Sequence, residues 1–136
     1  MRGLFSNCAS LKEINFSNFN TENVTNMGFM FYGCSSLKKL NLSNFNTNNV
    51  TDIFSMFCGC SSLKELKLSN FNTNNVTNMR GMFSGCSSLK ELNVSHFHFK
   101  EKYIMESMLW GCSAQFQNKI RAQYKNIKEE AFDEWV

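Results

Sequence analysis

Six cysteines are the residues of this sequence best suited to chemistry, because thiols can form disulfides or bind metals. Five of them follow one another at intervals of 26 residues, at Cys8, Cys34, Cys60, Cys86 and Cys112. A fixed interval indicates a repeated structural unit, and side chains in register on stacked units point the same way. Their Cβ atoms then stay too far apart for a disulfide, although neighbouring strands lie only ~4.8 Å apart. We therefore predict a column of buried, reduced thiols.

The other candidates for a metal site are Cys58 and two histidines. Cys58 and Cys60 form a C-x-C pair, but no second pair stands at zinc-site spacing. His96 and His98 would share one face of an extended segment, yet they occupy columns that hold asparagine in other units. We interpret them as polar substitutions in a decaying repeat and expect no metal and no cofactor. No nucleophile triad, phosphate-binding glycine loop or carboxylate pair stands out from the repeats, so we expect no enzymatic activity.

The repeated unit must position these residues, and its first half predicts a strand. Each unit carries the pattern L-x-x-L-x-L-x-x-F, which alternates at period two across its centre. In the second unit the expected strand covers residues 37–42. Strands of stacked units would pair in parallel. The apolar columns of this half are Leu11, Leu37, Leu63 and Leu89; Ile14, Leu40, Leu66 and Leu92; Phe16, Leu42, Leu68 and Val94; and Phe19, Phe45, Phe71 and Phe97.

The second half of each unit predicts a short helix. Ile53, Met56 and Phe57 have the spacing of a helix face behind Thr51, a suitable N-cap. A glycine stands where a left-handed residue would end that helix, at Gly33, Gly59, Gly85 and Gly111. The sequence therefore predicts an α/β repeat solenoid of the leucine-rich-repeat type, with one parallel strand and one short helix in each 26-residue turn.

The C-terminal part departs from the repeat and predicts a cap. The repeat decays near Phe99 and Lys102, which replace a threonine and a valine column. Beyond it, Phe116, Ile120 and Trp135 belong to an apolar series at steps of mostly three or four. We expect residues 1–114 to form an array of about 4.5 repeats and residues 115–136 to form a single capping helix, because an array end would otherwise expose its core.

One segment carries a resemblance to a known family. Residues 79–95, Met-Arg-Gly-Met-Phe-Ser-Gly-Cys-Ser-Ser-Leu-Lys-Glu-Leu-Asn-Val-Ser, with Asn72–Thr77 before them, resemble the repeat of BspA-like leucine-rich proteins. The resemblance covers roughly residues 1–98 and recurs in register. It implies a surface or secreted protein that acts in adhesion or partner binding, since the family consists mostly of bacterial and protist surface proteins. It implies no particular ligand.

The outward face of the strands is the natural binding surface of such an array. Its candidate residues are Glu13, Asn15, Lys39, Asn41, Glu65, Lys67, Glu91 and Asn93. These two columns vary while a serine column beside them does not. We predict a non-enzymatic interaction module of adhesin type that binds a protein or glycan through this face. The alternative is a structural segment of a longer array, or a self-associating scaffold.

Charge gives a further candidate surface. Four lysines form a column at Lys12, Lys38, Lys64 and Lys90. Such a column could bind an anionic partner, but we favour a solubilising edge, because glutamates stand beside most of these lysines. A net charge of +3 is too small to predict a nucleic-acid partner. The sequence contains no apolar run long enough to span a membrane and no signal peptide.

The N-terminal end predicts an uncovered edge. Residues 1–8 align with residues 79–86, so the sequence starts in the middle of a unit. The strand expected at Lys12–Ser17 would have a partner on one side only, and the core residues beside it would be exposed. We therefore predict a homodimer in which two such strands pair antiparallel.

Overall fold

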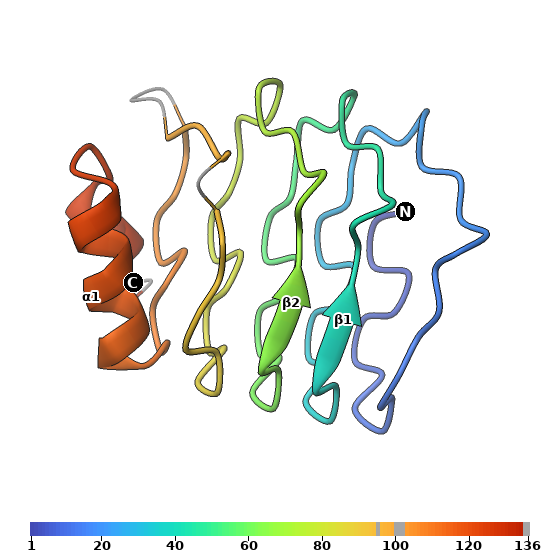
Figure 1. Cartoon of the computed structure of the whole chain (residues 1–136), viewed down its shortest axis with the longest axis horizontal. Helices are drawn as coiled ribbons and strands as arrows, with labels where there is room; N and C mark the ends of the chain where they lie inside the picture. The colour runs from blue at the N-terminus through green and yellow to red at the C-terminus, as the bar shows by residue number, and fades with distance from the viewer. Residues whose placement is uncertain (95, 100–102, 135–136) are drawn as a thin grey trace.

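The computed structural model describes residues 1–94, 96–99 and 103–134, and it shows 26-residue coils stacked side by side (Figure 1). Neighbouring coils are joined by backbone hydrogen bonds at equivalent positions. The amide of Phe31 donates to the carbonyl of Met56 at 2.9 Å, and the amide of Phe57 donates to the carbonyl of Met82 at the same distance. The interval of the cysteine column is therefore the length of one coil.

The predicted strands form in two coils and are shorter than expected. β1 (Lys39–Asn41) and β2 (Glu65–Lys67) pair in parallel, with Leu40 opposite Leu66. The strand predicted at Lys12–Ser17 is wrong, because this segment of the described chain is irregular and bows away from β1 (Figure 1). The outermost coil has a neighbour on one side only, so its backbone gains little from extended pairing. The predicted antiparallel pairing in a homodimer required a strand at this place, so that pairing is no longer expected. The homodimer itself stays a prediction.

The helix predicted in the second half of each unit is also wrong. Residues 27–34 form consecutive turns, in which amides donate alternately to the next coil and to a carbonyl three residues back. The amide of Phe29 reaches the carbonyl of Phe54 at 2.8 Å, whereas the amide of Met30 reaches that of Met27 at 3.3 Å. Hydrogen bonds between coils thus use backbone amides and carbonyls that would bond to one another within a helix. Phe29 itself has a φ of 58°, which an α-helix does not contain.

The glycine column and the burial pattern are confirmed despite the different backbone. Gly33 has a φ of +72° and Gly59 a φ of +77°, the left-handed conformation that only glycine adopts without steric cost. Ile53, Met56 and Phe57 are buried, as the spacing predicted. Their side chains point inward because consecutive turns also return the chain to one face every three to four residues.

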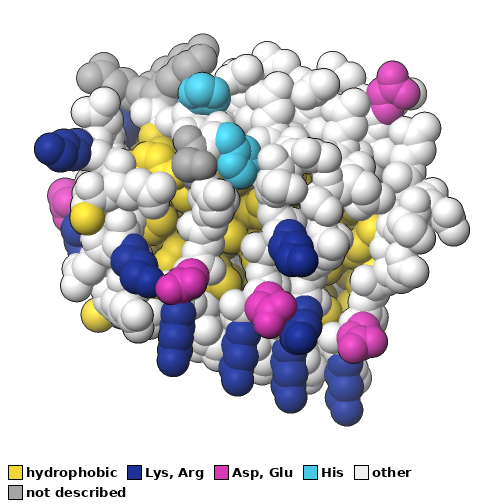
Figure 2. Space-filling view, viewed as in Figure 1, with side chains coloured by type: hydrophobic (Ala, Val, Ile, Leu, Met, Phe, Trp, Pro, Cys, Tyr) yellow, Lys and Arg dark blue, Asp and Glu magenta, His cyan; other side chains and the backbone are white. Residues whose placement is uncertain are grey.

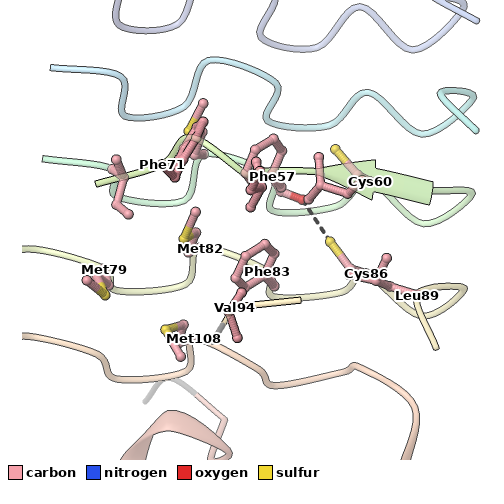
Figure 3. Packing of buried hydrophobic residues seen from close by; sticks show 14 of the residues in the cluster. Phe57, Cys60, Phe71, Met79, Met82, Phe83, Cys86, Leu89, Val94 and Met108 are labelled. Atoms are coloured by element: carbon pink, nitrogen blue, oxygen red, sulfur yellow. Dashed lines mark hydrogen bonds between the residues drawn. The ribbon is translucent and has the colours of Figure 1, made fainter. Parts of the chain in front are cut away.

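Aromatic and sulfur side chains fill the core between the strand side and the turn side (Figure 3). The rings of Phe31 and Phe57 stack with centroids 5.7 Å apart, and those of Phe57 and Phe83 stack at 5.6 Å. Burying one such side chain contributes about 1.5–3 kcal/mol. Each coil repeats the same buried set, so its stability comes mostly from its two neighbours.

The cysteine column behaves as predicted at four of its five positions. Cys34, Cys60, Cys86 and Cys112 are buried, and all cysteines are free. Each buried thiol donates to a phenylalanine carbonyl of the preceding coil, as Cys86 does to Phe57 at 3.1 Å (Figure 3). The prediction is wrong for Cys8, which is exposed, because its coil is the outermost of the stack.

The C-terminal segment consists of two pieces, so the prediction of a single helix is wrong. α1 (Ala114–Gln123) is followed by the 3-10 helix η1 (Glu129–Ala131). Ser113 caps α1 by accepting a hydrogen bond from the amide of Phe116 at 3.2 Å. Phe116 and Ile120 are buried, as predicted, and Trp135 lies outside the described residues.

The break between the two pieces has a physical reason. After α1 the chain returns to the turn side, where the carbonyl of Glu130 accepts from the amide of Ser107 and that of Ala131 from the amide of Leu109, both at 2.7 Å. An unbroken helix would leave these two amides of the last coil without those acceptors. In the described part of the chain, no helix has the length and apolar character needed to cross a bilayer.

Candidate binding surface

Four of the predicted binding residues point outward from the paired strands. In β1 and β2 the central leucine is buried and both flanking residues are exposed, which places Lys39, Asn41, Glu65 and Lys67 on one face. The ammonium of Lys39 lies 3.7 Å from a carboxylate oxygen of Glu65. Both side chains are more than half exposed, so this ion pair adds little stability and can be exchanged for contacts with a ligand.

A hollow of about 360 Å³ opens on this face, and six of the eight predicted residues line it. They are Glu13, Asn15, Lys39, Asn41, Glu65 and Lys67. The hollow exists because residues 12–17 do not pair with β1, and it is floored by half-buried Ile14 and buried Leu40. Figure 2 shows hydrophobic side chains between the charged ones on this face. A depression of this size with an apolar floor and a polar rim is typical of a binding site.

The rim carries charges of both signs and oriented amides. Asn41 accepts hydrogen bonds through its side-chain oxygen from the amide and the hydroxyl of Ser43, at 3.0 and 2.6 Å. Asn15 accepts from the amide of Ser17 at 2.9 Å in the same way. These local bonds fix both asparagine side chains at the rim. Fixed polar groups around an apolar floor can select a partner by charge and shape.

The remaining two predicted residues lie elsewhere. Glu91 and Asn93 stand beside α1, where they line a separate hollow of about 270 Å³ with Phe116, Ile120 and Gln123. A carboxylate oxygen of Glu91 lies 3.0 Å from the ammonium of Lys119. The C-terminal cap therefore covers this end of the strand face and ties Glu91 to it.

Both histidines take part in the hydrogen bonding of the stack, His96 through its ring and His98 through its backbone amide, which donates to Oγ1 of Thr73 at 3.0 Å. The Nε2 atom of His96 lies 2.8 Å from the carbonyl oxygen of Leu68. Asn44 makes the equivalent contact, donating through its side chain to the carbonyl of Phe16 at 2.8 Å. His96 thus replaces an asparagine in its structural role. Among the described residues, no group of three or more histidine, cysteine or acidic side chains is arranged to hold a metal ion.

The thiols of the core are held in the neutral form. Burial raises the pKa of Cys34 to about 11 and that of Cys60 to about 12, because a thiolate loses its hydration there. The partly buried Cys58 shows a rise in pKa from the same cause. Since the thiolate is the reactive form, these cysteines are poor nucleophiles.

A second hollow, on the turn side, was missed by the sequence prediction. It measures about 430 Å³ and combines the aromatic side chains of Phe29, Tyr32, Phe54 and Trp110 with small residues between them, including Cys58 and Ser84. The signal for it was present, because the column of Tyr32, Cys58, Ser84 and Trp110 changes size from unit to unit. Two small residues between two large ones make a depression in a stack of otherwise equal coils.

Comparisons with known proteins give a family and a fold. The family model described as "Mycoplasma protein of unknown function, DUF285" matches residues 1–123. A leucine-rich repeat protein from Eubacterium ventriosum is similar in structure, with a TM-score of 0.53 and 19% identity over 82% of this chain. One from Bacteroides ovatus gives a TM-score of 0.40 and 19% identity over 80% of the chain.

This chain spans 27% of the first of these structures and 37% of the second. No curated protein matches it. The first likeness shows that the chain shares the fold of a bacterial leucine-rich repeat protein.

Proposed function

We propose that this chain, which belongs to the DUF285 family, is a non-enzymatic module that binds a protein through the hollow on its strand face. The observation that carries this proposal is the convergence of six variable, exposed residues around one depression with an apolar floor. A hydrophobic centre inside a polar rim is the usual anatomy of a protein interface. We further propose a solenoid of BspA-like type with an adhesin role at a cell surface, in keeping with the resemblance of its repeats.

The arrangement of the hollow supports a protein in preference to a small molecule. Its floor residues, Ile14 and Leu40, come from coils that are not paired at this point, so the opening is broad. Its rim offers the carboxylates of Glu13 and Glu65 and the ammonium groups of Lys39 and Lys67. A partner with an apolar anchor flanked by opposite charges would satisfy both the floor and the rim.

Filling the hollow tests this proposal. Binding of wild-type protein to a panel of defined extracellular proteins and to a displayed random-peptide library would be measured by surface plasmon resonance. Asn41→Trp places a large side chain in the hollow and should weaken binding of the selected ligands at least about tenfold, which corresponds to about 1.4 kcal/mol. Asn118→Trp adds the same side chain on the exposed side of α1 and serves as the control.

The proposal fails if the selected ligands bind the filled variant as tightly as wild-type protein, because their site would then lie elsewhere. It also fails if Asn118→Trp weakens them equally. Thermal melting of both variants would show that the fold is retained.

A further inference from the structure

The four column lysines form a straight, exposed row along one edge of the molecule. Figure 2 shows basic side chains projecting side by side along the lower edge of the strand face. Lys12, Lys38, Lys64 and Lys90 are all exposed. The amide of Lys64 donates to the carbonyl of Lys38 at 2.9 Å, so the two middle lysines sit on hydrogen-bonded neighbouring coils. The spacing of Lys38 and Lys64 is therefore that of paired strands, ~4.8 Å, whereas Lys12 belongs to the segment that does not pair with β1.

The glutamates beside the row do not neutralise it. The ion pairs within residues 1–94, 96–99 and 103–134 involve none of the four lysines. Glu65 pairs with Lys39 on the strand face, and Glu91 pairs with Lys119 on the cap. Two of the three neighbouring acids thus face other cations, and the lysines face one another. Like charges at this spacing repel until an anion lies along them.

Hydroxyl groups flank the lysine row. A hollow of about 380 Å³ beside it is lined by Lys12, Lys38, Ser36 and Ser62, together with Glu13 and Lys39. The serine position is constant in the four units that carry the lysine, at Ser10, Ser36, Ser62 and Ser88. Serine hydroxyls both donate and accept hydrogen bonds, which suits sugar hydroxyls and sulfate or carboxylate oxygens.

We propose that the lysine row binds a linear anionic polysaccharide, with one charged sugar placed against each lysine. A row of charges one residue wide fits a single extended chain, because a pyranose ring advances such a chain by close to the spacing of paired strands. The lining of the hollow contains no aromatic side chain on which a base could stack, and this disfavours single-stranded nucleic acid. This site lies on the edge of the molecule and adjoins the protein-binding hollow, since Glu13 and Lys39 line both, but none of the four row lysines lines that hollow.

Salt dependence of binding tests the proposal. A heparin oligosaccharide long enough to span four coils would be titrated by fluorescence anisotropy over a series of salt concentrations. With four charge contacts, the logarithm of the affinity should fall against the logarithm of salt concentration with a slope of about 3, by analogy with about 0.7 per contact for single strands. Lys38→Gln combined with Lys64→Gln should halve this slope and lower the affinity at least about tenfold.

The control removes two positive charges elsewhere, as Arg2→Gln with Lys125→Gln, both exposed and outside the row. It should leave affinity and slope close to wild type. Equal losses in both double variants would overturn the proposal by showing that only net charge matters. Tighter binding of a single-stranded oligonucleotide of equal charge, or of phosphatidylserine vesicles, than of the oligosaccharide would overturn it in favour of those anions, as would no binding at all.

Discussion

Replacing Thr47 with valine should destabilise the protein by about 2 kcal/mol, because its hydroxyl joins two coils. Thr47 is 2% exposed. Its Oγ1 atom donates to the carbonyl of Asn72 at 3.1 Å and accepts from the amide of Asn72 at 2.7 Å. Valine has nearly the same shape, so the variant creates no cavity and removes only the hydrogen bonds. Each lost bond costs about 1 kcal/mol, and a buried unpaired group up to about 3.

The expected value lies below the upper limit because Asn72 is only half-buried, and water can reach part of its backbone. With a urea m-value of about 2 kcal/mol per molar, the unfolding midpoint should fall by about 1 M. Thr51→Val is the matched control, because Thr51 is exposed and its hydroxyl makes a single bond of 3.3 Å to Thr25. It should change stability by less than about 0.5 kcal/mol. Equal midpoints for the two variants would refute the reasoning.

Three further predictions concern the thiols and the cap. A thiol reagent read by mass spectrometry should modify native protein first at Cys8 and then at Cys58; rapid labelling of the four buried thiols would contradict the packing. Burial raises the pKa of Cys60 from 9.0 to about 12, so the folded state holds that proton more tightly than the unfolded chain. The free energy of unfolding in urea should therefore fall as pH rises from about 9 towards 12, and a pH-independent value would be contrary to this. Removing residues 115–136 should cause aggregation on size-exclusion chromatography, and a soluble, cooperatively melting truncation would show that no cap is needed.

The period and the buried columns could be predicted from the sequence because each depends on residue type alone. An apolar residue that recurs every 26 positions must face the same interior in every coil. The left-handed conformation of Gly59 could be predicted equally well, since residues other than glycine adopt it only at a steric cost. Burial of Phe57 was predicted correctly although its backbone was assigned to a helix. The sequence pattern thus predicts the direction of a side chain better than it predicts the hydrogen bonding of the backbone.

The turn structure could not be predicted because it depends on bonds between coils. The spacing of Ile53, Met56 and Phe57 fits both an amphipathic helix and a run of turns with three-residue returns. Only the neighbouring coil decides between them, since its carbonyls accept from alternate amides. The C-terminal break has the same origin: Tyr124 is followed by neither glycine nor proline, and the chain leaves α1 to pair with the last coil.

The columns of the repeat keep the same residue type for different reasons. Buried columns such as that of Phe31 and Phe57 are constant because neighbouring rings must stack. Exposed side chains meet a similar demand only where they donate hydrogen bonds to a neighbouring coil, as Asn75 does to the carbonyl of Asn48. The outward positions of Lys39 and Glu65 differ in charge between coils. A surface that changes from coil to coil suits a partner without internal repetition, such as a protein. The lysine one position earlier, as at Lys38 and Lys64, is exposed as well and yet recurs in all four units. A constant exposed column matches a ligand that repeats at the same spacing, which a polysaccharide does and a folded protein does not.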